Sequence, residues 1–459
     1  MTNGFLRAAL LALSTALLLS CGGGGSGGGG SVALVGVGGT ASVTGSSLGD
    51  GSNSPVGGAA DGQGGSASGT GGGSAGTGGG SAGTGGTSTA ASGDDGSGVG
   101  SGGTGVSTAD ASGVGGVDGV GSIIVNGVRY NTDTAVLNVE DASALQLGMS
   151  AKVTGPFNAD LTSGVARRVD SAADLRGTLS SVDLVQGSFV ILGTTVTTDD
   201  ATVWADSTGL AAIPPGSTLQ VWGLPGAPGV LRATRVEQRG PSAPVLTGTV
   251  QNLDPLRRAF TIGAFTVDYS TAVLSGSLDG SPLANGTLVC VRAATVLLPG
   301  RLTATQVQWW YPVPRANATP VQLAGIVTDY GGLGSLRVLN VPVNAASAQI
   351  TGGPAGSVGN GVKVEVGGTM SNGVLQATKL KIRHVPGTGG PSSFTLIGTV
   401  GNFSSAASFR VRGQPVDASG PGVVFVNGTA ANLGNGVSVN IEGARVVNGV
   451  LIATRVSFQ

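Results

Sequence analysis

A short phrase built around Leu-x-Ala-Thr recurs through the last three-quarters of this chain. It reads GVLRATRVE at 229–237, GRLTATQVQ at 300–308, GVLQATKLK at 373–381 and GVLIATRVS at 449–457, with a degenerate copy, SGVARRVDS, at 163–171. The alanines of these phrases, at 166, 233, 304, 377 and 453, lie 67, 71, 73 and 76 residues apart. This period predicts a tandem array of five units of about 70 residues each.

Each unit has the sequence pattern of β-strands. A Gly-Thr-hydrophobic opening precedes two apolar runs joined by a tight turn, as in SFVILGTTVTT at 188–198, and this predicts a hairpin. Farther on, apolar residues alternate after a glycine, as at Val362, Val364 and Val366, which predicts a half-buried strand. The closing phrase supplies the last strand of the unit.

Several short strands in each unit need a way to hide their edges. We therefore expect an all-β chain of five tandem small OB-like β-barrel modules, arranged as beads and not as a continuous solenoid. The predicted modules span 113–172 (degenerate), 173–240, 244–311, 320–384 and 393–459. The first module has GVGGVDGV in place of the Gly-Thr-Val opening, so the pattern does not predict its first strand.

Residues 1–20 have the features of an export signal. They carry one charge, Arg7, and an apolar run from Ala8 to Leu19 that is too short to span a bilayer as a helix. The run ends in Leu18-Leu19-Ser20-Cys21, which resembles a bacterial lipobox. The resemblance implies a lipoprotein signal peptide over 1–20 and acylation of Cys21, by palmitate or similar chains, which anchors the protein in the membrane. Gly22, where Asp would favour the inner membrane, implies an outer-membrane lipoprotein on the periplasmic or cell-surface face; an ordinary secretory signal is the alternative.

The composition of residues 21–112 is that of a disordered tether. Gly, Ser, Thr and Ala dominate, and such a stretch buries too little apolar surface to order itself. The tether holds five acids and no Lys or Arg, whereas the repeats hold 22 Lys and Arg against 19 Asp and Glu. This small excess does not create the basic field that nucleic acid requires, so no nucleic-acid partner is expected.

The repeated phrases also resemble a known kind of domain. The phrases GSIIVNGVRYNT at 121–132 and LQLGMSAKVTG at 145–155, together with the Leu-x-Ala-Thr ending, look like a bacterial domain family of uncharacterised function that occurs as tandem copies in secreted lipoproteins. The likeness covers most of residues 113–459. The resemblance implies no reaction and supplies no catalytic residues.

Titratable residues are few and scattered. His384 is the only histidine, and its place after the strand KLKIR predicts a solvated linker residue. Asp199 and Asp200 are adjacent, so on a strand they would face opposite sides. Turn or strand-end roles are expected for most of the remaining candidates, which lie in three different units: Asp183, Asp254, Asp329 and Glu365. The sequence therefore predicts no catalytic residue, no metal site and no cofactor.

Two features remain as candidate surfaces. The alternation places Cys290 on the outer face of its strand, where we expect it to pack against a neighbouring module; a reactive surface thiol is the alternative. Trp309, Trp310 and Tyr311 come together at the end of the third unit. Such a cluster is either a ligand-binding platform or an interdomain contact, and we favour the interdomain contact.

These observations lead to one hypothesis and one alternative. The hypothesis is a lipid-anchored envelope protein, not an enzyme, whose repeated modules form a binding or structural array for an unidentified envelope protein or polysaccharide. The alternative is an envelope enzyme with its active site at a module interface. A pocket there that holds two or more carboxylates of shifted pKa would favour the enzyme.

Overall fold

The computed structural model describes residues 111–158, 160–296, 299–386 and 394–459. The predicted signal peptide, Cys21 and residues 21–110 of the predicted tether lie outside these ranges. Within them the chain is all β apart from three single turns of 3-10 helix, η1 (Leu210–Ala212), η2 (Ala355–Ser357) and η3 (Ala430–Asn432). No helix among the described residues is long and apolar enough to cross a membrane.

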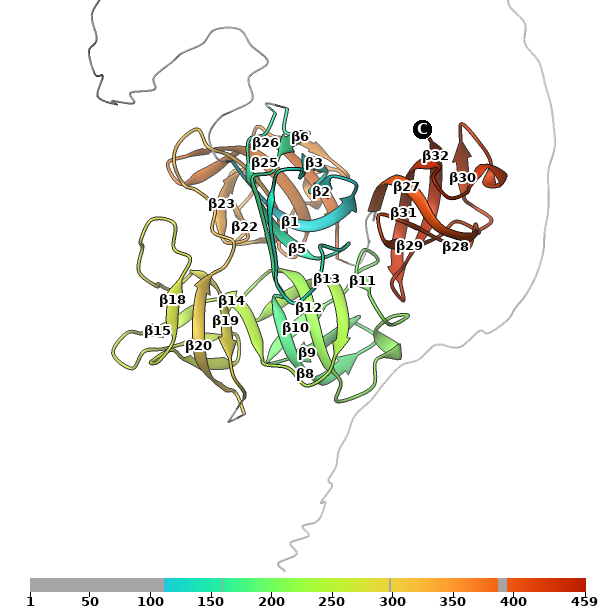
Figure 1. Ribbon diagram of the computed structural model, residues 1–459. Coiled ribbons are helices and arrows are strands. Elements are labelled where there is room, and N and C mark those ends of the chain that lie inside the picture. The colour runs from blue at the N-terminus through green and yellow to red at the C-terminus, as the bar shows by residue number, and fades with distance from the viewer. Residues whose placement is uncertain (1–110, 159, 297–298, 387–393) are drawn as a thin grey trace, which may run out of the picture. The chain divides into compact units, whose positions relative to one another are not determined.

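The same succession of strands recurs five times, and we number these sets repeats 1 to 5 (Figure 1). Repeat 1 contains β1 (Ala111–Val120), β2 (Ile123–Val125), β3 (Val128–Asn131), β4 (Val136–Val139), β5 (Ser150–Gly155), β6 (Ser163–Val165) and β7 (Arg168–Ser171). Repeat 2 contains β8 (Leu175–Asp183), β9 (Ser188–Ile191), β10 (Thr194–Thr197), β11 (Val203–Trp204), β12 (Thr218–Pro225) and β13 (Val230–Arg239). Repeat 3 contains β14 (Val245–Thr249), β15 (Gln251–Asp254), β16 (Ala259–Ile262), β17 (Phe265–Asp268), β18 (Val273–Ser275), β19 (Leu288–Ala293) and β20 (Arg301–Trp309).

The last two repeats follow the same plan. Repeat 4 contains β21 (Pro320–Thr328), β22 (Leu336–Val338), β23 (Val341–Asn344), β24 (Gln349–Thr351), β25 (Lys363–Ser371) and β26 (Val374–His384). Repeat 5 contains β27 (Phe394–Ser405), β28 (Ser408–Val411), β29 (Gln414–Asp417), β30 (Val424–Val426), β31 (Ser438–Val447) and β32 (Val450–Phe458). The degenerate phrase at 163–171 differs from the other closing phrases, because it forms two short strands, β6 and β7, instead of one long strand.

The predicted hairpins are confirmed in all five repeats. The pairs β2–β3, β9–β10, β16–β17, β22–β23 and β28–β29 are antiparallel with continuous register. The turn between β2 and β3 has positive φ at both central residues, Asn126 (57°) and Gly127 (72°), which is the geometry that matches the twist of two-residue hairpins.

The prediction of five separate OB-like barrels is wrong. Within repeat 2, β8 pairs with β9, β9 with β10, β10 with β13, β13 with β12, and β12 with β8 again, so the pairing makes a circuit of strands, which we call a coil. The coils are not free-standing, because the described strands belong to two hydrogen-bonded sheets of 19 and 13 strands, each of which runs through more than one repeat. The chain is therefore a stack of β-coils in the manner of a β-solenoid. The variation in repeat length does not prevent the repeats from stacking. Ladders such as β8–β14 join the repeats by hydrogen bonds between strands, whereas the loops are not part of these ladders.

Strand β1 makes the most extensive of these connections. It pairs antiparallel with β2 and β5 of its own repeat, parallel with β21 of repeat 4 through residues 112–114, and parallel with β27 of repeat 5 through residues 119–120. The segment GVGGVDGV, from which no strand was predicted, is thus the segment that joins repeats 1, 4 and 5.

Glycine is required in β1 because its neighbours approach too closely for a side chain. A Cβ on Gly119 would lie 2.5 Å from the backbone oxygen of Thr395 in β27. A Cβ on Gly115 would lie 1.9 Å from Oδ1 of Asn126, whose Nδ2 donates to the backbone oxygen of Val114. The Gly/Val composition of this segment therefore reflects packing on both sides of the strand.

The hydrophobic cores are shared between repeats. One cluster of buried side chains runs through repeats 2 and 3, from Leu175 to Val307. Val114 of β1 belongs to the core of repeat 4, and Leu147 and Val203 belong to the core of repeat 5. Each repeat is therefore stabilised in part by its neighbours, since burial of apolar surface is the main favourable contribution to folding.

The predicted alternation holds where a strand has one free face. In β25 and β31 the apolar positions are mostly buried and the positions between them mostly are not. In β12 and β19 the other face is covered as well: Gln220, Trp222 and Cys290 are at most 1% exposed. The alternation identified the inner face correctly, but it could not show that neighbouring repeats cover the outer face.

The Gly119→Ala variant tests the close approach of β1 and β27. The added methyl group overlaps a backbone atom that cannot rotate away, so we expect a loss of about 1–3 kcal/mol in the free energy of unfolding. Gly240→Ala is the matched control, because nothing lies within 4 Å of its Cβ position. Equal denaturation midpoints for the two variants would contradict the β1–β27 contact.

Candidate functional site

A buried carboxylate, Asp174, connects three repeats. It is 1% exposed and lies between repeats 1 and 2 in the sequence. Its Oδ2 accepts hydrogen bonds from Ser150 Oγ (2.5 Å) and from the Gly223 backbone N–H (2.8 Å), and its Oδ1 accepts one from Trp310 Nε1 (2.5 Å). Burial raises the pKa of Asp174 to about 7, although the three donated hydrogen bonds act in the opposite direction.

The predicted aromatic cluster lies where a junction between repeats meets a large cavity. Trp310 is 4% exposed, stacks on Tyr311 with ring centroids 4.4 Å apart, and packs against Ala172, Val245 and Cys290. The Tyr311 hydroxyl accepts a hydrogen bond from the Ala172 N–H (3.1 Å) and donates one to the Ser150 carbonyl (3.2 Å). Trp310 and Tyr311 therefore lie at a junction between repeats. All three aromatic residues line one large cavity, and Trp309, which is half-buried, also lines a second cavity.

Cys290 is fully buried beside Trp310. Burial raises the pKa of its thiol to about 12, so the thiol stays protonated at neutral pH and is a poor nucleophile. The expectation that Cys290 packs against its surroundings is confirmed, and the alternative of a reactive surface thiol is not supported.

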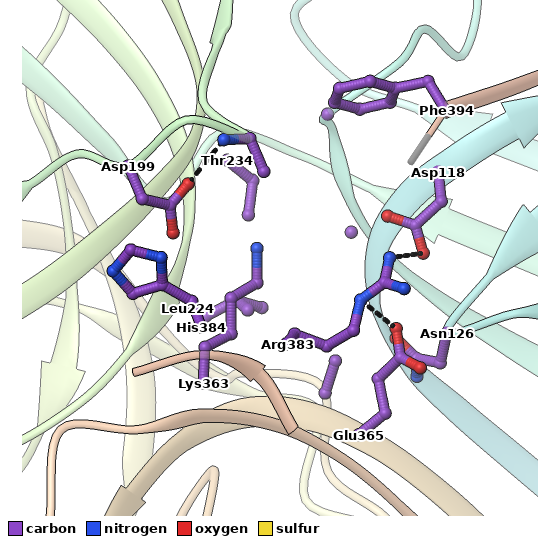
Figure 2. A pocket seen from close by; sticks show the side chains of 14 residues that line it. Asp118, Asn126, Asp199, Leu224, Thr234, Lys363, Glu365, Arg383, His384 and Phe394 are labelled. Carbon is purple, nitrogen blue, oxygen red and sulfur yellow. Dashed lines mark hydrogen bonds and ion pairs between the residues drawn. The ribbon is translucent and has the colours of Figure 1, made fainter. Parts of the chain in front are cut away.

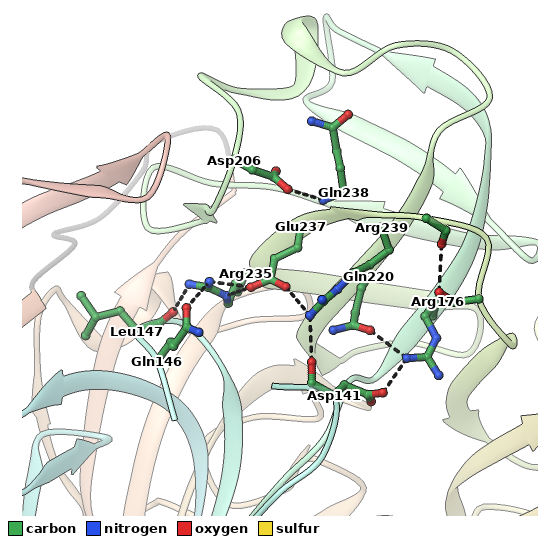
Figure 3. A network of polar contacts seen from close by, with 12 residues as sticks. Asp141, Gln146, Leu147, Arg176, Asp206, Gln220, Arg235, Glu237, Gln238 and Arg239 are labelled. Atoms are coloured by element: carbon green, nitrogen blue, oxygen red, sulfur yellow. Dashed lines mark hydrogen bonds and ion pairs between the residues drawn. The ribbon is translucent and has the colours of Figure 1, made fainter. Parts of the chain in front are cut away.

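A second polar junction joins repeats 1 and 2 (Figure 3). Arg235 donates to Glu237 Oε1 (2.7 Å) and to the Leu147 carbonyl (3.0 Å), and Arg176 donates to Asp141 Oδ1 (2.6 Å) and Gln220 Oε1 (2.8 Å). Arg235 also lies over the Trp222 ring, 5.9 Å from its centroid. These partners offset the cost of burying the charges and fix the relative position of the two repeats.

An enclosed pocket lies where repeats 1, 2, 4 and 5 meet, and we call it the inter-repeat pocket (Figure 2). Asp118 of β1, Asp199 of repeat 2, and Lys363, Glu365, Arg383 and His384 of repeat 4 contribute its charged or titratable side chains. Arg383 pairs with Glu365 (3.1 Å) and, more loosely, with Asp118 (3.8 Å). Asp199 pairs instead with Arg232 (3.2 Å).

The electrostatics of this pocket favour the neutral forms of two groups. Burial raises the pKa of Asp118 to about 6; Arg383 opposes this shift and Glu365 adds to it. Burial lowers the pKa of His384, against the opposing attraction of Asp199. Among the described residues, no three His, Cys, Asp or Glu side chains converge in a way that could hold a metal ion.

The size of the inter-repeat pocket limits what it can do. Its volume is about 30 Å³. That is room for a water molecule or a little more, whereas ligand sites in proteins have volumes of roughly 300–1,000 Å³. The pocket can therefore hydrate its charges, but it cannot enclose a sugar or a nucleotide.

A much larger open cavity, which we call the groove, lies along repeats 2, 3 and 4. Its volume is about 1640 Å³. Trp309, Arg315, Asp329 and Arg337 line it, together with asparagine and proline side chains. A half-exposed aromatic ring beside hydrogen-bonding groups is the surface that a polar chain molecule such as a polysaccharide can use.

The prediction for His384 is wrong, because it ends strand β26 and lines the inter-repeat pocket. Glu365, expected in a turn or strand-end role, lies within β25 and also lines the pocket. Asp183 and Asp254 do have the expected turn roles, since the Oδ1 of each accepts two backbone N–H groups. Sequence reasoning missed Asp118 and Asp174, because nothing local distinguishes a buried carboxylate from a solvated one.

Comparison with known proteins identifies a domain but not an activity. Residues 176–237, 324–381 and 397–457 each match the model of a domain of unknown function, DUF5666, so the chain contains three tandem copies similar to this uncharacterised domain. The three matches together cover less than half of the chain. A search of curated proteins found no match.

The raised pKa of Asp174 predicts a specific pH dependence. The Asp174 carboxyl binds its proton more tightly in the folded protein than in the unfolded chain. The contribution of this protonated carboxyl to the free energy of unfolding is therefore lost as pH rises from about 3.8 to about 7. The difference between these values corresponds to an energy on the order of 4 kcal/mol. Denaturant unfolding at several pH values should show wild type losing stability relative to Asp174→Asn over this window. Parallel pH profiles for the two proteins would contradict the prediction.

Proposed function

We propose that this chain is a lipid-anchored envelope protein whose stacked β-repeats serve as a binding or structural array and perform no catalysis. The Leu18-Leu19-Ser20-Cys21 segment and the Gly-rich stretch behind it support the anchor and the tether. The proposed location is the outer membrane, on its periplasmic or cell-surface face. The proposed partners are the membrane, through the lipid on Cys21, and an envelope polysaccharide or protein; nucleic acid is not among them.

The observation that carries the proposal is the contrast between the two cavities. The inter-repeat pocket holds six charged or titratable side chains around a volume of about 30 Å³, whereas the groove offers about 1640 Å³ lined by a half-buried tryptophan and hydrogen-bonding side chains. Open surface of this kind suits recognition of an extended molecule. Further surfaces of this kind on the same tethered chain would raise the effective concentration of the partner.

Catalysis at a repeat interface is the alternative function. In its favour, Asp118 and Glu365 come from different repeats, meet in one pocket, and Asp118 has a raised pKa. The small volume of the pocket weighs against it, because a general acid must come within hydrogen-bonding reach of its substrate. We therefore rank the binding array first.

The anchor predicts that Cys21→Ser abolishes acylation. Cells fed a labelled fatty acid should incorporate label into the full-length wild-type chain but not into Cys21→Ser, which should leave the membrane fraction. Cys290→Ala should be labelled like wild type, because the acceptor is the lipobox cysteine. Equal labelling of wild type and Cys21→Ser would contradict the anchor.

The binding role predicts that Trp309→Ala weakens binding without unfolding the protein. Loss of a central aromatic contact costs about 2 kcal/mol or more, so affinity should fall by at least about tenfold while the melting curve stays close to that of wild type. The probes are soluble envelope polysaccharides and peptidoglycan fragments, tested against the purified full-length chain. Trp310 is unsuitable for this test, because it is buried and bonded to Asp174. Binding unchanged by Trp309→Ala would contradict a ligand site at the groove, and absence of binding to every probe would leave a spacer role.

A further inference from the structure

The short strand that follows the hairpin is an edge strand in every repeat. These edge strands, β4, β11, β18, β24 and β30, each pair in parallel with the closing strand of their own repeat. In four repeats a valine of the edge strand lies opposite the residue that comes two positions after the alanine of the closing phrase. These valines are Val136, Val203, Val273 and Val424. They can therefore be compared directly.

These equivalent valines differ sharply in burial. Val203 of β11 is fully buried, but Val136, Val273 and Val424 are 60%, 65% and 53% exposed. Exposed valines on an edge strand offer both apolar surface and unpaired backbone groups, which proteins usually protect. In repeat 2, therefore, another part of the chain covers the edge strand.

The partner of β11 is the hairpin turn between β31 and β32 of repeat 5. The Gly449 N–H donates to the Trp204 carbonyl (2.9 Å), and the Asn448 N–H donates to the Ser207 carbonyl (2.8 Å). Gly449 lies so close that a Cβ on it would be 2.7 Å from the Ala205 oxygen. An Asn-Gly turn thus caps an edge strand through two backbone hydrogen bonds.

The chain contains a second copy of this turn with its glycine face uncovered. Asn372-Gly373-Val374-Leu375 in repeat 4 repeats the sequence Asn448-Gly449-Val450-Leu451. The backbone agrees as well: φ is 49° and 76° at Asn372 and Gly373, and 50° and 72° at Asn448 and Gly449. Nothing lies within 4 Å of the Cβ position of Gly373.

The edge strand of repeat 3 has the matching acceptors. Leu274 and Ser277 stand where repeat 2 has Trp204 and Ser207, and within the described ranges no hairpin turn donates to their carbonyl oxygens. A cavity of about 630 Å³, lined by Leu274, Gly276 and Ser277 among others, opens beside this strand.

We propose that the Asn372-Gly373 turn of one molecule docks on edge strand β18 of a second copy of this chain, through the contact that repeats 2 and 5 make within one molecule. Because the turn and the edge are different surfaces, the contact is heterologous and joins copies into rings or open chains. Docking replaces one hydrogen bond by another. In the single molecule the Asn372 N–H donates to Oδ1 of exposed Asn317 (2.7 Å), and in the docked pair it donates to the Ser277 carbonyl instead. This inference does not depend on the proposed anchor or on ligand binding.

The test is disulfide trapping between two differently tagged full-length copies in the same cells. One copy carries Asn372→Cys and the other Ser277→Cys, since residues joined by a backbone hydrogen bond have Cα atoms close enough for a disulfide. After mild oxidation we expect a mixed disulfide at least tenfold more abundant than for the matched control pair, Asn372→Cys with Val185→Cys. Val185 is 91% exposed and lies in the turn between β8 and β9 of repeat 2.

Two further substitutions separate docking from random collision. Asn317→Ala in the Asn372→Cys copy removes the competing acceptor and should raise the yield, whereas Val273→Lys in the Ser277→Cys copy should lower it severalfold. Maleimide labelling and circular dichroism establish that each cysteine is accessible and each variant folded. With that established, a yield no higher than the control pair, or a yield unaffected by Val273→Lys, would overturn the proposal.

Discussion

The structure depends on a glycine-rich strand that other strands can approach from both edges. β1 is hydrogen-bonded to β2 and β5 of its own repeat and to β21 and β27 of repeats 4 and 5. Side chains at Gly115 or Gly119 would overlap atoms of Asn126 or Thr395, so the connections require a strand with little side-chain volume. The first strand of the array is thereby placed beside the last two repeats, and the repeats stack instead of remaining separate.

Polar contacts at the junctions then fix how the repeats meet. Asp174 accepts hydrogen bonds from residues of repeats 1 and 2 and from Trp310 at the end of repeat 3, and Arg235 bridges repeats 1 and 2. Buried polar groups of this kind are costly unless their partners are in place, so they penalise any other arrangement of the coils. Trp309 takes no part in these contacts and lines the groove.

The sequence was sufficient for what is local and insufficient for what is distant. The five hairpins and the inner faces of β25 and β31 follow from turn chemistry and a period of two, both of which are visible within about a dozen residues. The pairing of β1 with β21 and β27 joins segments more than 200 residues apart, and no local pattern encodes it. The same limit applies to the burial of Cys290 and Trp222, the position of His384 and the pocket around Asp118. Each of these features can be predicted only when it is known which repeats are in contact. The inference of separate barrels failed at this point, because it treated each repeat as complete.

Hydrogen exchange of the full-length chain, read by mass spectrometry, tests the central claim most directly. If β1 joins repeats 1, 4 and 5, amides of residues 112–120 should exchange as slowly as those of β21 and β25, and should become exposed together with them in mild denaturant. Exchange of residues 112–120 at the rate of an unstructured chain, while β21 and β25 stay protected, would contradict the account.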